Sequence, residues 1–89
     1  MIAARGRFAY IETPPTVYHA GRTLPLAKLQ AKLLARLVSA EFVTVAELMA
    51  VGVKTPNSLR AQLSTLRHKL PAGCTLVNAY AKDYHLSIP

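Results

Sequence analysis

Leucines in the C-terminal half of the chain recur at the spacing of one face of a helix. The positions are Leu59, Leu63, Leu66 and Leu70, at steps of four, three and four. Because a helix advances about 100° per residue, these side chains fall on one side of it. The opposite side carries small, amide, hydroxyl and cationic groups and no carboxylate. The pattern therefore predicts an amphipathic helix over residues 56–70, packed through its leucines.

A second apolar pattern with helical spacing lies earlier in the chain. Leucines and valines between Leu26 and Val38 follow the spacing i, i+3, i+4, i+7. They predict a helix that begins at Pro25 or Leu26, since proline is tolerated in the first turn, and ends at Ser39. The cations on its outer face are Lys28, Lys32 and Arg36. We interpret these cations as a solvated surface in preference to a phosphate-binding one.

A short helix over residues 45–50 is predicted between these two. Thr44 and Glu47 have the spacing of a capping box, in which each side chain accepts a hydrogen bond from the other residue's free backbone N–H. Thr55 or Asn57 then caps the long helix. Short helix, turn and long amphipathic helix follow one another in the order of a helix-turn-helix.

Alternating runs near the two ends of the chain predict β-strands. Short β-prone runs separated by proline and glycine turns predict an N-terminal antiparallel meander within residues 8–24. Residues 75–88 predict a hairpin directly after the long helix, which is the place of a wing. Residues 1–7 are expected to form a flexible basic arm. The expected fold is a single α+β domain over residues 1–89, a winged helix-turn-helix with its three helices within residues 26–70.

The charge of the chain is strongly positive, with 11 Lys and Arg against 4 Asp and Glu and a formal net charge of +7. Between Glu47 and Asp83 there is no acidic residue. Positive potential of this kind raises the encounter rate with a polyanion such as a nucleic acid. An anionic membrane would also be attracted, but no stretch approaches the roughly 18 to 20 apolar residues of a spanning helix, and no signal-peptide pattern opens the chain. The expected location is therefore the cytoplasm, without a membrane partner.

Residue types that carry catalysis or bind metals are scarce in the sequence. The single cysteine, Cys74, is interpreted as a small, buried or half-buried apolar group rather than a nucleophile or metal ligand. The three histidines are scattered, with no cysteine or carboxylate at ligand spacing, and indicate no metal site. The sequence also has no paired carboxylates, glycine-rich phosphate loop or Ser/His/Asp set. It therefore predicts a protein that is not an enzyme, with no cofactor and no small-molecule substrate.

The run SLRAQLSTLRHKL followed by LVNAYAKDYHL resembles the recognition helix and wing of OmpR/PhoB-type winged-helix effector domains. The matching positions are Ser58, Leu59, Leu63, Leu66, Arg67, Leu70, Tyr84 and Leu86. Upstream, LLARLVSAEFVTVAELM is similar to the segment that joins the first two helices in that family. The family's N-terminal sheet has four strands, and the runs within residues 8–24 match it only loosely.

The chain departs from the family pattern in two places, at the start of the first helix and in the wing. Ala27 and Gln30 replace the Thr and Glu that open the family's first helix, which weakens the cap of that helix. In the wing, Tyr80 replaces an Arg, and Ala81 and Asp83 replace two glycines. No receiver domain accompanies these elements, so the family's phosphorylation switch does not carry over.

The resemblance implies that the helix over residues 56–70 enters the major groove of double-stranded DNA. It also implies that the wing over residues 75–88 lies on the backbone or in the minor groove. Arg60 is the first choice for a base contact, because an Arg fork can bind guanine O6 and N7 together. The other candidate base contacts are Ser64, Asn57, Ala61 and Thr65. The candidate phosphate contacts are Arg67, Lys69, Ser58 and Lys54, and those of the wing are Tyr80 and Lys82.

Several of these residues have a competing structural role. Arg67 could instead pair with Glu47 or with the C-terminal carboxylate, and Tyr80 could stack within the domain. His68 fits a surface position as well as a contact, whereas Tyr84 is expected in the core. The long helix as a whole also fits an ordinary solvated amphipathic helix, although such a helix normally mixes acids with bases.

Three functions are compatible with these observations. The leading hypothesis is a sequence-specific DNA-binding transcription regulator, which acts on double-stranded DNA alone or as a homodimer. The alternative is a winged-helix module that binds a protein such as RNA polymerase or another regulator, which the altered wing residues favour. The third is a non-specific architectural DNA-binding protein, driven by the net charge of +7.

Overall fold

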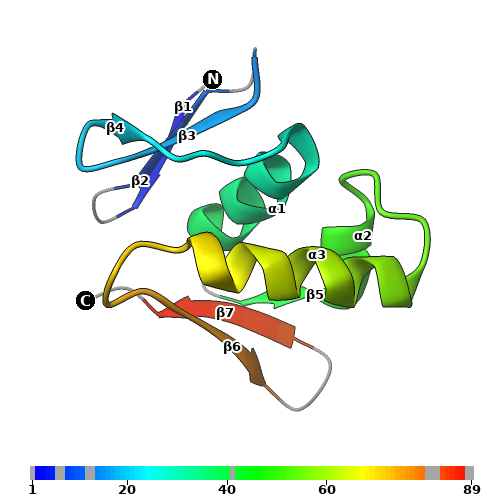
Figure 1. The fold of residues 1–89 in the computed structure, drawn as a ribbon. Coiled ribbons are helices and arrows are strands. Elements are labelled where there is room, and N and C mark those ends of the chain that lie inside the picture. Colours follow the sequence, from blue (N-terminus) through cyan, green and yellow to red (C-terminus); the bar gives the residue numbers. More distant parts are fainter. Residues whose placement is uncertain (1, 6–7, 12–13, 41, 80–82, 88–89) are drawn as a thin grey trace.

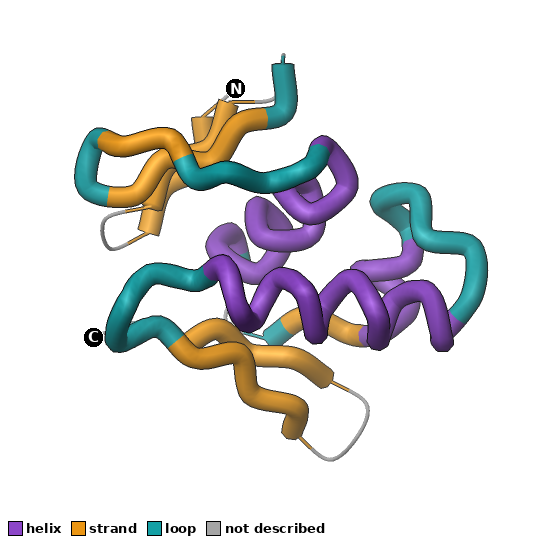
Figure 2. The backbone as a smooth tube through the Cα atoms, viewed as in Figure 1, coloured by secondary structure: helices purple, strands orange, loops and turns teal. Residues whose placement is uncertain are grey.

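Two antiparallel sheets enclose the main helices of the domain (Figure 1). The computed structural model describes residues 2–5, 8–11, 14–40, 42–79 and 83–87. The elements are β1 (Ile2–Arg5), β2 (Phe8–Ile11), β3 (Thr16–His19), β4 (Arg22–Thr23), α1 (Lys28–Ser39), β5 (Val43–Thr44), α2 (Val45–Met49), α3 (Pro56–Lys69), β6 (Thr75–Ala79) and β7 (Asp83–Ser87). Figure 2 shows α1 and α3 between the two groups of strands. The fold is α+β, as the sequence predicts.

The N-terminal sheet has four strands in the order β1-β2-β3-β4, all antiparallel. The predicted flexible arm over residues 1–7 is therefore wrong for residues 2–5, which form β1. Ile2 lies opposite Ile11 and Arg5 opposite Phe8, so β1 pairs with β2 along its whole length. This pairing fills hydrogen-bonding positions on β2 that local propensity does not reveal.

The inner face of this sheet packs on α1. Phe8 and Val17 point to that face and are buried, and the ring of Phe8 lies 4.8 Å from that of His19, its cross-strand partner. On α1, Leu33, Leu34 and Leu37 are fully buried. The helical pattern between Leu26 and Val38 thus forms the centre of the core.

The first helix begins at Lys28, later than the predicted Pro25 or Leu26. Its N-cap, Ala27, is extended and has no side-chain acceptor, and the backbone N–H of Leu26 instead donates to the carbonyl of Leu24 at 2.9 Å. Residues 24–26 therefore form a connection and not a first turn.

Side-chain caps fix the start of both helices of the helix-turn-helix. The Thr44 hydroxyl accepts a hydrogen bond from the Glu47 N–H at 3.1 Å, and the Thr55 hydroxyl accepts one from the Ser58 N–H at 3.1 Å. Of the two predicted caps for the long helix, Thr55 is confirmed, with Pro56 as the first helical residue. The first three of its predicted core leucines are buried, at exposed fractions of 1%, 2% and 0% for Leu59, Leu63 and Leu66.

The wing belongs to a sheet of three strands, in the order β5-β7-β6. The predicted hairpin is confirmed, and the short β5 adds to its other edge, with Val43 opposite Tyr84. Leu76, Tyr84 and Leu86 point inward and are buried. Residues 80–82, which include the predicted wing contacts Tyr80 and Lys82, lie outside the described residues. Within the described part of the chain, no helix is both long and apolar enough to span a membrane.

Candidate nucleic-acid interface

The non-leucine side of α3 divides into three surfaces. The outermost surface, which we call the crest, consists of Asn57, Ala61, Ser64, Thr65 and His68, all exposed. One flank of the helix, with Gln62 and Lys69, meets α1. The other flank, with Arg60 and Arg67, borders the wing. The sequence predicts a single outward face, and the neighbours of α3 decide this further division.

The flank toward α1 is closed by the side chain of Gln30, of which 6% is exposed. Its Oε1 accepts hydrogen bonds from the Ala27 backbone N–H at 3.2 Å and from the Lys69 Nζ at 3.0 Å. Its Nε2 donates to the Gln62 Oε1 at 3.3 Å. One buried amide therefore caps α1 and binds two turns of α3. Lys69, a predicted phosphate contact, is half-buried and uses part of its ammonium group in this joint.

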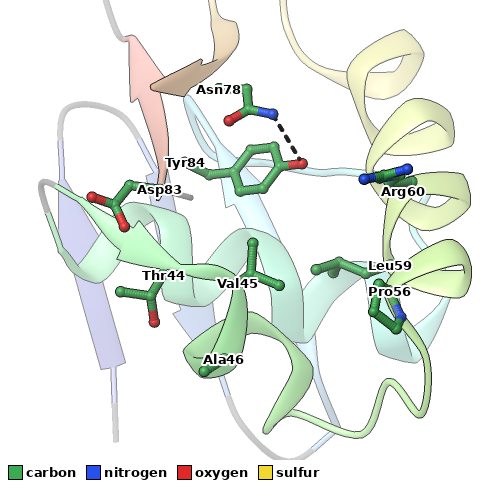
Figure 3. A pocket seen from close by; sticks show the side chains of 9 residues that line it. All are labelled: Thr44, Val45, Ala46, Pro56, Leu59, Arg60, Asn78, Asp83 and Tyr84. Atoms are coloured by element: carbon green, nitrogen blue, oxygen red, sulfur yellow. Dashed lines mark hydrogen bonds between the residues drawn. The ribbon is translucent and has the colours of Figure 1, made fainter. Parts of the chain in front are cut away.

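The flank toward the wing is hollowed instead of closed. A hollow of about 210 Å³ lies between α3 and the wing and is lined by Arg60, Leu63, Ser64, Arg67, Asn78 and Tyr84. The Asn78 Nδ2 donates to the Tyr84 hydroxyl at 3.5 Å, a bond drawn in Figure 3. Among the described residues, neither arginine has an ion pair or hydrogen bond through its guanidinium.

A larger hollow, of about 520 Å³, adjoins the first at the N-terminal end of α3. Its lining is Thr44, Val45, Ala46, Pro56, Leu59, Arg60, Asn78, Asp83 and Tyr84 (Figure 3). The wall formed by α2 and the start of α3 is mostly apolar, and the Tyr84 ring lies between Asp83 and Arg60 in this view. Arg60 thus borders both hollows, on the wing side of the helix and away from the centre of the crest.

Two crest side chains are tied to the backbone of their own helix. The Thr65 hydroxyl donates to the Ala61 carbonyl at 3.1 Å, and the His68 Nδ1 lies 2.8 Å from the Ser64 carbonyl oxygen. Thr65 therefore keeps its hydroxyl oxygen as an acceptor and has no free proton to donate. Asn57 and Ser64 are both exposed, and Ser64 also lines the wing hollow.

The structure decides some of the competing structural roles that the sequence left open. Glu47 pairs with Arg36 at 2.8 Å, so the expected alternative of an Arg67–Glu47 pair is wrong. Tyr84 is a core residue, as expected, with 7% of its surface exposed. Cys74 is half-buried, and burial raises the pKa of its thiol, which agrees with an apolar role.

The remaining predicted contacts lie at the start of α3. Lys54 and Ser58 are both exposed, and the Ser58 N–H is used by the Thr55 cap. The sequence reasoning missed Asn78, although one signal was available. Asn78 is the cross-strand partner of Tyr84 and shares the inward-facing alternation of Leu76 and Leu86, where a polar residue is out of pattern.

Comparison with known proteins supports the fold. No protein-family model and no curated protein matches the chain. Among solved structures, the chain is similar to a mutant of RitR, an OmpR/PhoB-family response regulator, with a TM-score of 0.74 and 19% sequence identity. The match covers 98% of this chain and 43% of the RitR chain, so this chain spans less than half of that protein's length. The chain has the winged helix-turn-helix fold of OmpR/PhoB-type effector domains, as its sequence resemblance implies.

Proposed function

We propose that this chain binds double-stranded DNA sequence-specifically and regulates transcription, with α3 in the major groove and the wing on the backbone or in the minor groove. The observation that carries the proposal is the composition of α3. Its crest and wing flank carry one amide, two hydroxyls, an imidazole and two arginines, and the whole helix has no carboxylate. The fold is that of a regulator's DNA-binding domain, which makes an acid-free helix at this position a candidate for DNA recognition.

Base reading is assigned first to the crest. Asn57 and Ser64 offer hydrogen-bonding groups there, Thr65 offers an acceptor, and Ala61 offers a methyl group for contact with a thymine. Arg60, the first choice from sequence, borders the crest on its wing side. Lys54, Ser58 and Arg67 remain candidates for phosphate contacts that fix the register of the helix.

A selection from random duplexes tests this proposal. We expect a short preferred site, as single or paired half-sites, and loss of discrimination at one base pair in Asn57→Ala or Ser64→Ala, worth about 1–3 kcal/mol. Lys32→Ala, an exposed position on α1, is the control and should leave the preference unchanged. Steep salt dependence without any sequence preference would favour non-specific architectural binding instead.

Failure to retain any duplex at physiological salt would overturn the proposal and favour the alternative, a protein-binding module. The surface to probe in that case is the outer face of the wing sheet. Phe42 and Val77 are exposed there, at 54% and 40%, and His85 lies between them, with its ring 5.4 Å from that of Phe42. Capture of a protein partner that survives nuclease and is lost in Phe42→Ser would support that function.

A further inference from the structure

The hollow of about 210 Å³ between α3 and the wing is lined by two arginines and by three further polar side chains. We propose that it holds one phosphodiester group of the DNA backbone and that Arg60 and Arg67 bind this group together. This inference rests on the proposed DNA binding and deepens it. It removes Arg60 from the base-reading set and gives the wing residue Asn78 a role in the contact.

The α3 wall of the hollow supplies two cations, and Ser64 lies between them at the border with the crest, where it stays a base-reading candidate. Arg60, Ser64 and Arg67 are spaced by four and three residues, so they form one stripe along the helix. The two arginines are about 10 Å apart along the axis, a span that two long side chains can close on one anion. Both are exposed, and neither guanidinium is engaged by a group within the described residues.

The wing wall of the hollow is fixed in place by the core. Asn78 and Tyr84 are cross-strand partners, so their side chains lie on the same face of the sheet. Because Tyr84 is only 7% exposed, its ring is held by packing and its hydroxyl stands at a fixed point. That hydroxyl accepts a bond from the Asn78 Nδ2, which leaves its own proton for a ligand.

The polar groups of the lining are mainly hydrogen-bond donors. The polar lining residues are Arg60, Ser64, Arg67, Asn78 and Tyr84, and among the described residues no carboxylate lines the hollow. Donors with net positive charge select an anion, and charge-assisted bonds of this kind are the strong ones. The volume suits an oxyanion with bridging water and not a base pair. A backbone phosphate beside a helix in the major groove has the right chemistry and position.

The experiment measures duplex affinity against salt concentration for Arg60→Ala and Arg67→Ala, on the selected site and on an unrelated duplex. We expect each variant to weaken both duplexes alike, by roughly 10- to 100-fold, and to lower the salt slope by less than the value for one phosphate. The double variant should lower it by about 0.9, because only then does the shared phosphate lose both cations. Arg22→Ala is the matched control, since it removes the same charge from an exposed position on β4, remote from α3. It should leave both affinity and slope near those of the unchanged protein.

Two neutral variants test the wing wall. Tyr84→Phe removes only a hydroxyl and Asn78→Ala only an amide, so we expect several-fold weaker binding with an unchanged salt slope and an unchanged melting temperature. A scan of single methylphosphonate linkages then locates the phosphate. One and the same linkage should weaken the unchanged protein most, Arg60→Ala and Arg67→Ala less, and the double variant not at all.

The outcomes separate this inference from the proposed function. Binding in which Arg60→Ala relaxes the preference at one base pair and keeps its salt slope would overturn the shared phosphate and return Arg60 to base reading. Different methylphosphonate positions for the two arginines would overturn it as well. No binding of any duplex by the unchanged protein would overturn the proposed function, and the phosphate site with it.

Discussion

The two flanks of α3 carry similar polar groups, but one flank is hydrogen-bonded to α1 and the other borders an open hollow. On the α1 side, Lys69 and Gln62 bond to the buried amide of Gln30. On the wing side, Arg60 and Arg67 border an open hollow, and their guanidinium groups bond to no other described residue. The same helix therefore has one polar flank that contributes to the fold and another that remains available to a ligand.

This difference shows how a small domain can fix one flank of a helix and leave the other flank open. A buried polar group must be hydrogen-bonded, and Gln30 meets this requirement through bonds that also fix the position of α3 against α1. Exposed arginines carry no such requirement, because water solvates them until an anion arrives. Substitutions should therefore separate stability from binding according to the flank that they affect.

The largest effect is expected on the buried leucine side of α3, which holds both flanks in place. Leu66→Ala removes a fully buried side chain and should lower the free energy of unfolding by about 2–5 kcal/mol, because a cavity remains in the core. For a domain of this size, that loss is a large part of the total stability. Chemical denaturation measures it, with Ser64→Ala on the crest as the control, expected within about 0.5 kcal/mol. Equal midpoints for the two variants would contradict the orientation of α3.

The closed flank should give the next largest effect. Gln30→Leu keeps a similar volume but leaves the Ala27 N–H, the Lys69 ammonium and the Gln62 oxygen without their partner, so we expect a loss of about 1–3 kcal/mol. Gln30→Glu is the informative control. It keeps an acceptor for Ala27 and Lys69 and loses only the donor to Gln62, so thermal denaturation should place it between Gln30→Leu and the unchanged protein. A stable Gln30→Leu variant would show that the joint does not hold α3.

The smallest effect is expected at the exposed ion pair between α1 and α2. Arg36 and Glu47 lie 2.8 Å apart, and each side chain is 44% exposed, so solvent screens their attraction. Arg36→Ala should cost less than about 1 kcal/mol, and the loss should shrink as salt is added. If Arg36→Ala lowered the free energy of unfolding as much as Gln30→Leu, then the charge of a contact, and not its burial, would decide how much it stabilises the helices.

Much of this architecture could be predicted from the periodicity of the chain. The leucine spacing indicates the long helix and its buried side, and Thr44 and Thr55 mark the starts of α2 and α3 as N-caps. Only half of the predicted capping box forms, because the Glu47 carboxylate accepts a hydrogen bond from the Thr44 hydroxyl and not from its backbone N–H. These signals are local, since they depend on residues within one or two turns of each other. The wing hairpin was predictable for the same reason, because its alternation and its turn are adjacent in sequence.

The features that depend on distant contacts were not predictable in this way. β1 forms because it pairs with β2, and β5 joins the wing because Val43 and Tyr84, 41 positions apart in sequence, become partners. From the sequence, Gln30 predicts only a weaker cap for the first helix. In the structure its amide also forms hydrogen bonds with two residues of α3. Local propensity contains no information about such partners.

By itself, the sequence determined the order of the three helices and the wing hairpin, the buried side of α3, and the positive charge that favours a nucleic acid. The tertiary structure alone decided which polar residues of α3 remain open. Arg60, Arg67 and Lys69 have similar charge in the sequence, and only the packing of α1 on one flank and the wing on the other distinguishes them. The physical reason is that a cation's role depends on which group reaches it, and the groups here come from elements far apart in the chain.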